Sequence, residues 1–319
     1  MKKILITGAN GFIGSFLVEE AVNNGWQTWA GVRKNSNKEY LKDLSIRFID
    51  LNYADKDQLK KQILEQVDQY GKWDYIIHNA GITKCLNPSD FERINYLFTK
   101  NLIETLQETG AIPEKFIFMS SLSAHSQCET EYGKSKRKTE LFLENQNAFP
   151  YLILCPTGVY GPREKDYFLI LKAVQKGLDI AAGLETQKLT FIYVKDLVKA
   201  VFLALERPVV RKTYFVTDGN SYLDKEYITI VKNALGKRHV LKIRIPFALL
   251  KTVCIISEKM ARFTKKPATL NRDKYNIMKQ RDWTCDTFPL KADLDFQADY
   301  DLKSGINECL KWYRTNGWL

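Results

Sequence analysis

Near its N-terminus the chain reads Ile4-Leu5-Ile6-Thr7-Gly8-Ala9-Asn10-Gly11-Phe12-Ile13-Gly14. The apolar run predicts a strand over residues 3–7, and the pattern that follows it predicts a helix over residues 12–23. Glycine in the turn between them can adopt a positive φ and lets the backbone approach a ligand. A helix N-terminus adds free N–H groups and a positive dipole end, which suit a phosphate. The stretch predicts a dinucleotide-binding turn, with the pyrophosphate held by Gly8, Asn10, Gly11, Phe12, Ile13 and Gly14.

Strand and helix patterns continue to alternate through the first half of the chain. Short apolar segments bounded by turn residues predict strands at residues 27–32, 47–49, 74–78, 116–119 and 151–154. Helices are expected at residues 55–69, 89–108 and 132–145. This alternation indicates an α/β fold with a doubly wound parallel sheet (Rossmann), covered by helices on both faces. Ligands of such sheets bind at the carboxyl ends of the strands.

The pattern becomes less regular in the second half of the chain. Strands are expected at residues 189–192 and 213–216, and helices at 166–176, 194–206, 224–235, 247–263 and 302–315. We expect a dinucleotide-binding Rossmann core over residues 1–160, to which residues 189–218 return. Residues 161–188 and 219–319 are expected to form a smaller, mostly C-terminal substrate-binding region.

The end of the second expected strand indicates which cofactor is preferred. An NAD site usually places an acidic residue there to hold the ribose 2′-OH. This chain instead has Arg33 and Lys34, and the next acidic residue is Glu39. A guanidinium pairs well with a 2′-phosphate, so NADP(H) is the expected cofactor and NAD(H) the alternative. Asp50 and Leu51, after the third strand, are expected to border the adenine.

A second motif carries acid–base chemistry. Tyr132 and Lys136 are four residues apart in Tyr132-Gly133-Lys134-Ser135-Lys136, so on a helix they share one face. A nearby ammonium favours the phenolate, and the lowered tyrosine pKa would suit proton transfer to a carbonyl oxygen. Ser121 follows the fifth expected strand, where its hydroxyl can hydrogen-bond the same oxygen. These three residues are the predicted catalytic group.

Taken together, these motifs resemble the extended short-chain dehydrogenase/reductases. Four further segments are similar to that family: His78-Asn79-Ala80-Gly81, Asn95, the run from Pro156 to Arg163, and Phe191 to Asp196. The C-terminal Trp312 to Leu319 also looks like a common family ending. The resemblance covers nearly the whole chain and leans toward dihydroflavonol-type reductases and 3β-hydroxysteroid dehydrogenases.

The resemblance implies a role for each matching residue. Ser121 would orient the carbonyl, Tyr132 would act as acid and base, and Lys136 would bind the nicotinamide ribose. Pro156 and Val159 would flank the nicotinamide, and Asn79, Ala80 and Gly81 would lie beside the cofactor. Substrate contacts are expected from Thr83, Ser123 and Tyr160.

The function expected is NADP(H)-dependent reduction of an aldehyde or ketone, or oxidation of the corresponding alcohol. A nucleotide-sugar epimerase or dehydratase that recycles bound NAD is the first alternative. The short connection between Ser121 and Tyr132 and the presence of Arg33 count against it. A non-catalytic NADP-binding scaffold or sensor is the second alternative, and the intact Ser121, Tyr132 and Lys136 count against that.

Composition and motif content narrow the classes of partner and ligand expected for this protein. The net charge is +11 over 319 residues, but the basic residues are scattered, with short runs such as Lys265-Lys266 and no nucleic-acid-binding motif. We therefore expect a small-molecule substrate and no nucleic acid, and a homodimer stays open. The six cysteines form no CxxC pair and the histidines lack metal-ligand spacing, so no metal is expected.

Location and membrane contact can be judged from the apolar segments. The N-terminal apolar run is too short for a signal peptide, and no segment approaches a membrane span, so a cytoplasmic location is expected. Residues 246–263 form a basic amphipathic stretch. This stretch has two possible roles, which are packing over the substrate pocket and docking on a membrane surface.

Overall fold

A seven-stranded parallel sheet forms the centre of the molecule. The computed structural model describes residues 1–265, 268 and 270–319. The strand order is β11-β6-β5-β4-β1-β2-β3, and every pairing is parallel. The strands are β1 (Lys3–Thr7), β2 (Gln27–Gly31), β3 (Arg47–Ile49), β4 (Tyr75–His78), β5 (Lys115–Met119), β6 (Tyr151–Pro156) and β11 (Lys212–Val216). The order reverses at β1, so the predicted doubly wound Rossmann fold is confirmed.

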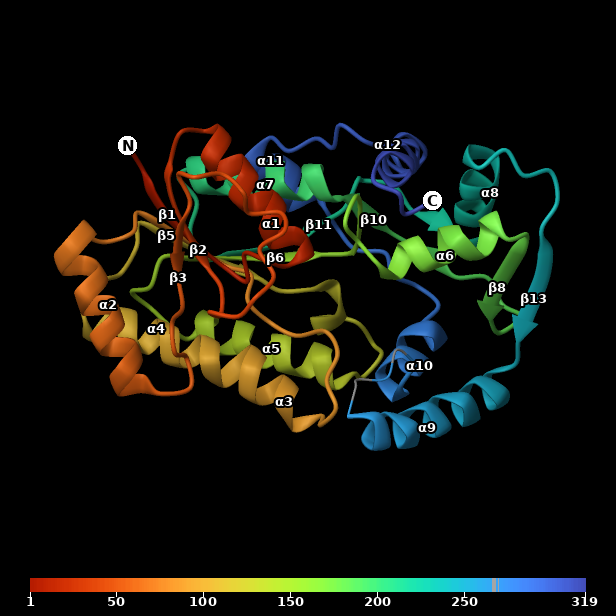
Figure 1. The fold of residues 1–319 in the computed structure, drawn as a ribbon, viewed down its shortest axis with the longest axis horizontal. Coiled ribbons are helices and arrows are strands. Elements are labelled where there is room, and N and C mark those ends of the chain that lie inside the picture. The colour runs from red at the N-terminus through yellow and green to blue at the C-terminus, as the bar shows by residue number, and fades with distance from the viewer. Residues whose placement is uncertain (266–267, 269) are drawn as a thin grey trace.

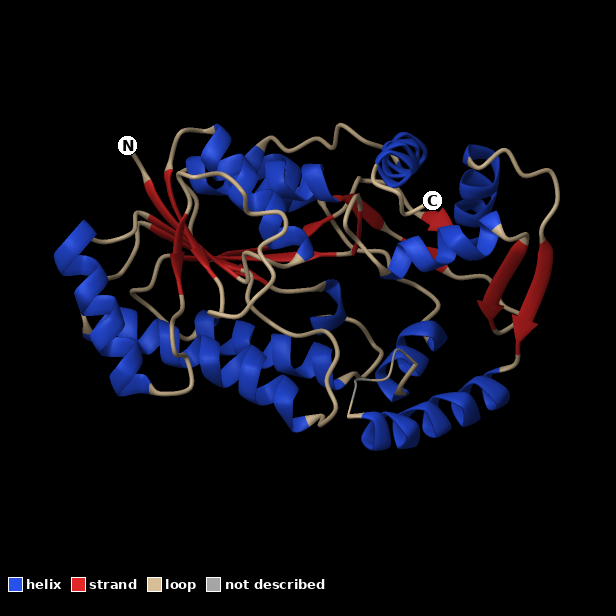
Figure 2. Cartoon of the chain, in the orientation of Figure 1, coloured by secondary structure: helices blue, strands red, loops and turns tan. Residues whose placement is uncertain are grey.

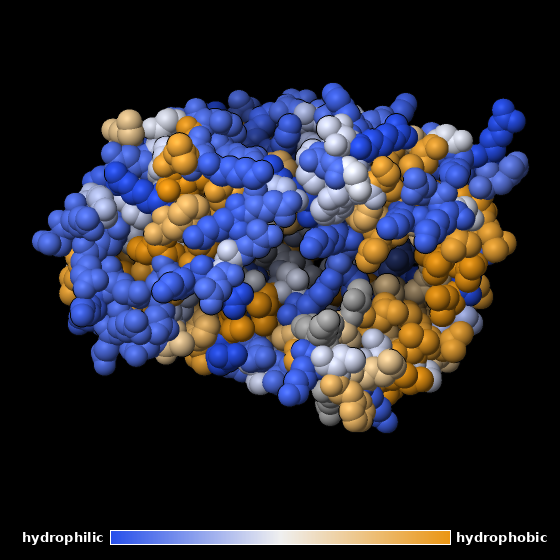
Figure 3. All heavy atoms as spheres, in the orientation of Figure 1, coloured by the Kyte–Doolittle hydropathy of each residue, from blue (hydrophilic) through white to orange (hydrophobic). Residues whose placement is uncertain are grey.

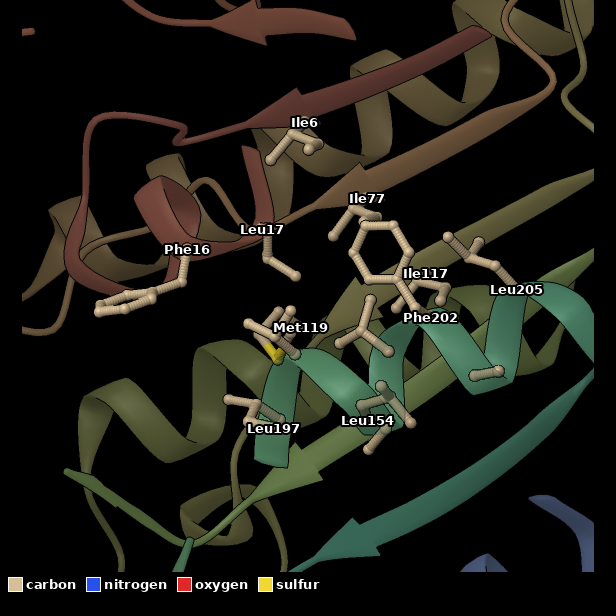
Figure 4. Packing of buried hydrophobic residues seen from close by; sticks show 14 of the residues in the cluster. Ile6, Phe16, Leu17, Ile77, Ile117, Met119, Leu154, Leu197, Phe202 and Leu205 are labelled. Atoms are coloured by element: carbon tan, nitrogen blue, oxygen red, sulfur yellow. The ribbon is translucent and has the colours of Figure 1, made fainter. Parts of the chain in front are cut away.

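Helices cover both faces of the sheet (Figure 1). One face carries α1 (Phe12–Asn23), α7 (Val194–Glu206) and α11 (Phe288–Leu294); the other carries α2 (Lys56–Tyr70), α4 (Phe98–Glu108) and α5 (Glu131–Glu144). Successive strand residues alternate between these layers: Ile117 packs toward α1 and α7, and Phe118 toward the opposite helices. Figure 4 shows Ile6, Ile77 and Met119 facing α1 and α7. Burial on both faces explains the continuous apolar strands of the sequence.

The helix expected over residues 89–108 is continuous but changes its winding. A single turn, α3 (Ser89–Phe91), leads into a π-helical segment, η1 (Glu92–Leu97), and then into α4. π-Helical turns are rare and often occur at functional sites. This one contains the buried Asn95.

The remaining elements lie beyond the carboxyl ends of the strands (Figures 1 and 2). They are η2 (Leu122–Ala124), β7 (Gly158–Tyr160), α6 (Asp166–Gln175), β8 (Leu178–Ala182), β9 (Lys188–Leu189), β10 (Phe191–Tyr193), β12 (Tyr222–Leu223), α8 (Asp224–Ala234), β13 (Leu241–Ile245), α9 (Phe247–Thr264), α10 (Arg272–Lys279) and α12 (Leu302–Thr315). A third core cluster, rich in Tyr and Phe, holds α6, α8 and α12 together.

Two expectations for this region need correction. The single strand expected over residues 189–192 is two strands, because β9 pairs with β12 while β10 pairs with β7. The helix α11 lies within the segment expected to bind substrate, yet Leu290 and Leu294 pack into the sheet's core cluster. The division of the chain into a core and a substrate-binding region otherwise stays a prediction. In the described part of the chain, none of the helices has both the length and the apolarity needed to cross a membrane.

Candidate active site

The glycine turn is shaped by two close backbone approaches. Gly8 has φ +64°, and a Cβ there would lie 2.9 Å from the Asn79 carbonyl oxygen. A Cβ on Gly14 would lie 2.1 Å from the Gly8 carbonyl oxygen, whereas the nearest atom to one on Gly11 is 3.2 Å away. Gly8 and Gly14 are therefore required by the turn itself, and Gly11 is exposed beside the helix start. No described side chain caps α1, which leaves its first N–H groups available to an anion.

A large cavity runs from this turn along the carboxyl edge of the sheet. Its volume is about 1160 Å³. Thirteen of the predicted site residues line it: Gly8, Asn10, Gly11, Phe12, Ile13, Asn79, Gly81, Thr83, Ser121, Tyr132, Lys136, Pro156 and Val159. The fold thus brings the glycine turn and the predicted catalytic group to one cavity. An elongated cavity with an uncapped helix start at one end fits a dinucleotide.

Other predicted residues lie outside this cavity. Gly14 is buried, and Leu51 is buried in the core cluster on the α2 and α4 face of the sheet. Arg33 and Lys34 are exposed, and the Lys34 N–H donates to the Asp50 carboxylate at 2.8 Å. Ala80 is half-buried, and its N–H donates to Thr7 Oγ1 at 3.0 Å. Ser123 lines the neighbouring cavity described below.

The substrate contact expected from Tyr160 is wrong. Its ring is buried in the third core cluster and lines neither cavity. Its hydroxyl donates to the Asp301 carbonyl oxygen at 3.2 Å. Tyr160 therefore joins β7 to α12, and the apolar sequence around it could not distinguish that role from contact with substrate.

The predicted effect of Lys136 on Tyr132 also needs correction. Burial raises the pKa of Tyr132 to about 12, and the interaction with the Ser121 side chain opposes this shift. Burial lowers the pKa of Lys136 to about 8. The Lys136 ammonium donates to the Met119 carbonyl oxygen at 2.7 Å and lies 4.7 Å from the centre of the Phe118 ring. In this structure desolvation, not a neighbouring cation, dominates the pKa of Tyr132.

Asn95 connects the segment after β4 to the helix of Tyr132 and Lys136. Its amide Oδ1 accepts from the Ile82 N–H at 2.8 Å, and its Nδ2 donates to the Ile82 carbonyl oxygen and to Ser135 Oγ at 3.1 and 3.0 Å. Because Asn95 is buried in η1, these bonds hold the cavity wall and α5 in a fixed relation.

The start of α5 is capped by a residue from the C-terminal part of the chain. The Asp273 carboxylate accepts from the N–H groups of Glu131 and Tyr132, both at 3.2 Å. Asn276, one turn later on α10, donates to the Glu129 carbonyl oxygen at 2.8 Å. Sequence reasoning missed both contacts, because more than 140 residues separate the partners.

A buried carboxylate lies under the loop that carries Ser121. Glu140 is fully buried and accepts from Ser120 Oγ, from the Arg137 guanidinium at 2.9 Å and from Cys155 Sγ at 3.4 Å. His125 Nε2 lies 2.8 Å from the same carboxylate. Burial raises the pKa of Glu140, but hydrogen bonds from His125 and Ser120 outweigh it, and the net pKa is lowered. Glu140 thus ties the loop to α5.

The side chains around Glu140 include three types of residue that can bind a metal ion. Donor atoms of His125, Glu140 and Cys155 lie within 4.8 Å of one another. Arg137 already pairs with the Glu140 carboxylate, however, and a cation there repels a metal ion. Burial also raises the pKa of the Cys155 thiol, which disfavours the thiolate that a metal would need. The geometry therefore supports hydrogen bonding at this cluster.

A second cavity, of about 470 Å³, adjoins the first at Ser121. It extends between α6, β8, β13, α8 and α10, and most of its lining is apolar, including Leu189, Phe191, Tyr227, Ile245 and Leu250. Its lining includes one described cation, Arg244, which pairs with Asp179 through two N–O contacts of 3.1 Å. Asp179 is itself buried.

Comparison with known proteins places the chain in a family. Residues 4–216 match the model of the NAD dependent epimerase/dehydratase family. The chain belongs to this family. It is thus an NAD(P)-dependent enzyme of the extended short-chain dehydrogenase/reductase type, as the sequence motifs predicted.

The chain is similar to proteins of several activities. A ceramide reductase of Caulobacter vibrioides is 24% identical over 320 residues, covering 99% of this chain and 96% of that protein. The structure of a Thermotoga maritima UDP-glucose 4-epimerase with UDP-glucose superposes with TM-score 0.78 at 19% identity, covering 98% and 99% of the two chains. A dTDP-glucose 4,6-dehydratase from Bacillus anthracis in complex with NAD gives TM-score 0.76 at 16% identity, covering 100% and 98%.

Proposed function

We propose that this protein is an NADP(H)-dependent oxidoreductase that reduces the carbonyl group of a large apolar substrate, or oxidises the corresponding alcohol. The observation that carries the proposal is the apolar cavity that meets the cofactor-sized cavity at Ser121. A substrate in the apolar cavity can present its carbonyl where the two cavities join.

The residues at that junction supply binding and proton transfer. The bound nicotinamide would supply the hydride for the carbonyl carbon. Ser121 donates a hydrogen bond to the carbonyl oxygen, and Tyr132 gives that oxygen its proton, so the product is an alcohol. Lys136 holds the ribose hydroxyls, because its ammonium has three N–H donors, lines the cavity and uses one donor on the Met119 carbonyl oxygen. Pro156 and Val159 form the wall against which the nicotinamide packs.

The charge of the apolar cavity favours this substrate class over a nucleotide sugar. A nucleotide diphosphate needs unpaired cations or N–H donors to balance its charge. The Arg244 guanidinium is engaged by Asp179, and the other described lining residues of this cavity carry no positive charge. Burial of apolar substrate surface is the stabilisation that such walls offer, about 25 cal/mol per Å². The name of the Caulobacter relative, ceramide reductase, is consistent with an apolar substrate.

Arg33 and Lys34 support the preference for NADP(H). Both follow the carboxyl end of β2, and Arg33 makes no ion pair with a described residue. Glu39, which lines the large cavity, favours NAD(H) instead because a carboxylate can accept from a ribose hydroxyl. We give Arg33 more weight because it lies closer to the strand end in sequence.

A chain-length series tests the substrate class. We expect NADPH consumption with long-chain aliphatic ketones to exceed that with short-chain ketones, and we expect no epimerisation of UDP-glucose. Ala182→Trp should fill the apolar cavity, raising KM for long chains while sparing short ones. Ala54→Trp, on an exposed loop, is the matched control. Epimerisation of UDP-glucose would overturn the proposal in favour of a nucleotide-sugar enzyme, and NADPH binding without turnover of any carbonyl would favour a sensor.

A further inference from the structure

The helix α9 carries an apolar stripe on its outer face. Leu249, Val253, Ile256, Met260 and Phe263 recur at intervals of three or four residues and are 55%, 39%, 52%, 60% and 88% exposed. This spacing places them along one side of the helix. Leu250 and Cys254 lie on the other side and are buried, and Leu250 lines the apolar cavity. Packing over the cavity therefore uses one face of α9 and leaves a second apolar face uncovered.

The neighbouring strand pair extends this apolar surface. Ile180 on β8 is paired with Ile243 on β13, and they are 48% and 37% exposed. Figure 3 shows hydrophobic residues gathered at this end of the molecule, over β8, β13 and α9. Ile180 also lines the apolar cavity, as does Ile170, which is 37% exposed. Residues that both line the cavity and face solvent mark its opening, and the opening lies on this apolar surface.

Positive charge accompanies the exposed apolar residues. Lys251 and Lys259 are exposed on α9, and Lys265 follows its end. The single acidic residue of α9, Glu258, is paired with Arg272 at 3.4 Å. Arg262 and Lys266 add positive charge in the sequence, but the Arg262 side chain and residue 266 lie outside the described residues. A helix with an exposed apolar stripe and several exposed lysines around it suits the interface of a bilayer with anionic lipids.

We propose that α9, with Ile180 and Ile243 beside it, docks this protein on an anionic lipid bilayer. The apolar stripe enters the acyl boundary, and the exposed lysines add electrostatic attraction to the anionic headgroups. A second copy of the chain is the alternative occupant of this surface, and the oligomeric state in solution distinguishes it from a bilayer. Docking would place the mouth of the apolar cavity at the bilayer, which is where apolar molecules reside.

Vesicle co-sedimentation tests the proposal without requiring catalysis. The protein should bind vesicles of phosphatidylcholine with phosphatidylglycerol and bind those of phosphatidylcholine alone much less. Ile256→Glu combined with Met260→Glu should lower the partition coefficient by about tenfold or more, since two exposed apolar side chains are lost. Leu64→Glu with Lys61→Glu, on the exposed face of α2, should leave it unchanged.

Two results would overturn this assignment. One is failure of the unmodified protein to bind anionic vesicles. The other is a dimer in light scattering that Ile256→Glu with Met260→Glu converts to a monomer, without an effect on vesicle binding. Both positions are exposed, and unchanged thermal unfolding of the variant will show that it is folded.

Discussion

The Lys136 ammonium donates to the Met119 carbonyl oxygen at 2.7 Å. Lys136 lies one turn after Tyr132 on α5, and Met119 is the last residue of β5. This bond holds a buried cation across the base of the large cavity. Lys136 thus has two roles in this structure and its proposed reaction. It closes the junction of α5 and β5 in the protein alone, and it would hold the ribose when cofactor binds.

The first prediction concerns the stability of the protein without cofactor. Burial lowers the pKa of Lys136 from 10.5 to about 8, so the unfolded chain holds a proton that the folded protein loses between these values. Stability should therefore rise with pH across this window. Lys136→Met should abolish that rise. Near neutral pH it should also increase the free energy of unfolding by at most about 3 kcal/mol, and loss of the hydrogen bond to Met119 will reduce this gain. Urea unfolding near neutral and alkaline pH measures the free energy of unfolding and its pH dependence, and Lys134→Met is the exposed control.

The second prediction concerns proton transfer. Tyr132→Phe keeps the ring and removes the hydroxyl, so turnover should fall by about 10²–10⁴-fold while NADPH affinity is retained. Ser121→Ala should lower turnover by about 10²–10³-fold, also without weakening NADPH binding. Steady-state kinetics and fluorescence titration separate the two effects, and Tyr96→Phe on η1 is the control. Full turnover by Tyr132→Phe would reject the mechanism.

The third prediction distinguishes two glycines of the same turn. A Cβ on Gly14 would lie 2.1 Å from the Gly8 carbonyl oxygen, so Gly14→Ala should lower the melting temperature markedly. Gly11→Val should leave the protein folded and abolish cofactor binding, because Gly11 is exposed beside the uncapped start of α1. Thermal unfolding and calorimetric titration give the two readouts. NADPH binding by Gly11→Val at the original affinity would contradict the proposed pyrophosphate site.

The fourth prediction concerns cofactor choice. If Arg33 contacts the 2′-phosphate, Arg33→Asp removes a charge-assisted hydrogen bond of about 1.5–3 kcal/mol. The ratio of NADPH to NADH affinity should fall by about ten- to a hundredfold. Arg238→Asp makes the same charge change at an exposed position and should leave the ratio unchanged. Equal affinities for both cofactors in the unmodified protein would show that Arg33 does not select NADPH over NADH.

The fifth prediction concerns the buried carboxylate beneath the Ser121 loop. The lowered pKa of Glu140 means that its ionised form stabilises the fold above the usual carboxyl pKa, and that this stability is lost as pH falls through the lowered value. Glu140→Gln should weaken this acid dependence and cost about 1–3 kcal/mol near neutral pH. Glu144→Gln is the matched control, since Glu144 contacts the same Arg137 from a more exposed position. Identical acid unfolding curves for Glu140→Gln and the unmodified protein would disprove this role.

Local sequence patterns determined the sheet and the placement of its motifs. Strand β1 and helices α7 and α12 have the expected bounds, because apolar periodicity and turn residues act over a few neighbours. The turn at Gly8 and Gly14 was predictable for the same reason: the need for a positive φ and for missing side chains is local. The shared helix face of Tyr132 and Lys136 follows from their spacing alone.

Tertiary structure decided what surrounds these motifs. The pKa of Tyr132 depends on desolvation by residues distant in sequence, so the nearby Lys136 predicted the wrong direction. Asp273 reaches the start of α5 from far along the chain, and Glu140 meets His125 and Cys155 only after β6 and α5 pack together. The apolar cavity likewise forms between elements such as β8 and β13, which pair across a long separation. Burial and charge pairing depend on the whole packed chain, and local patterns do not contain them.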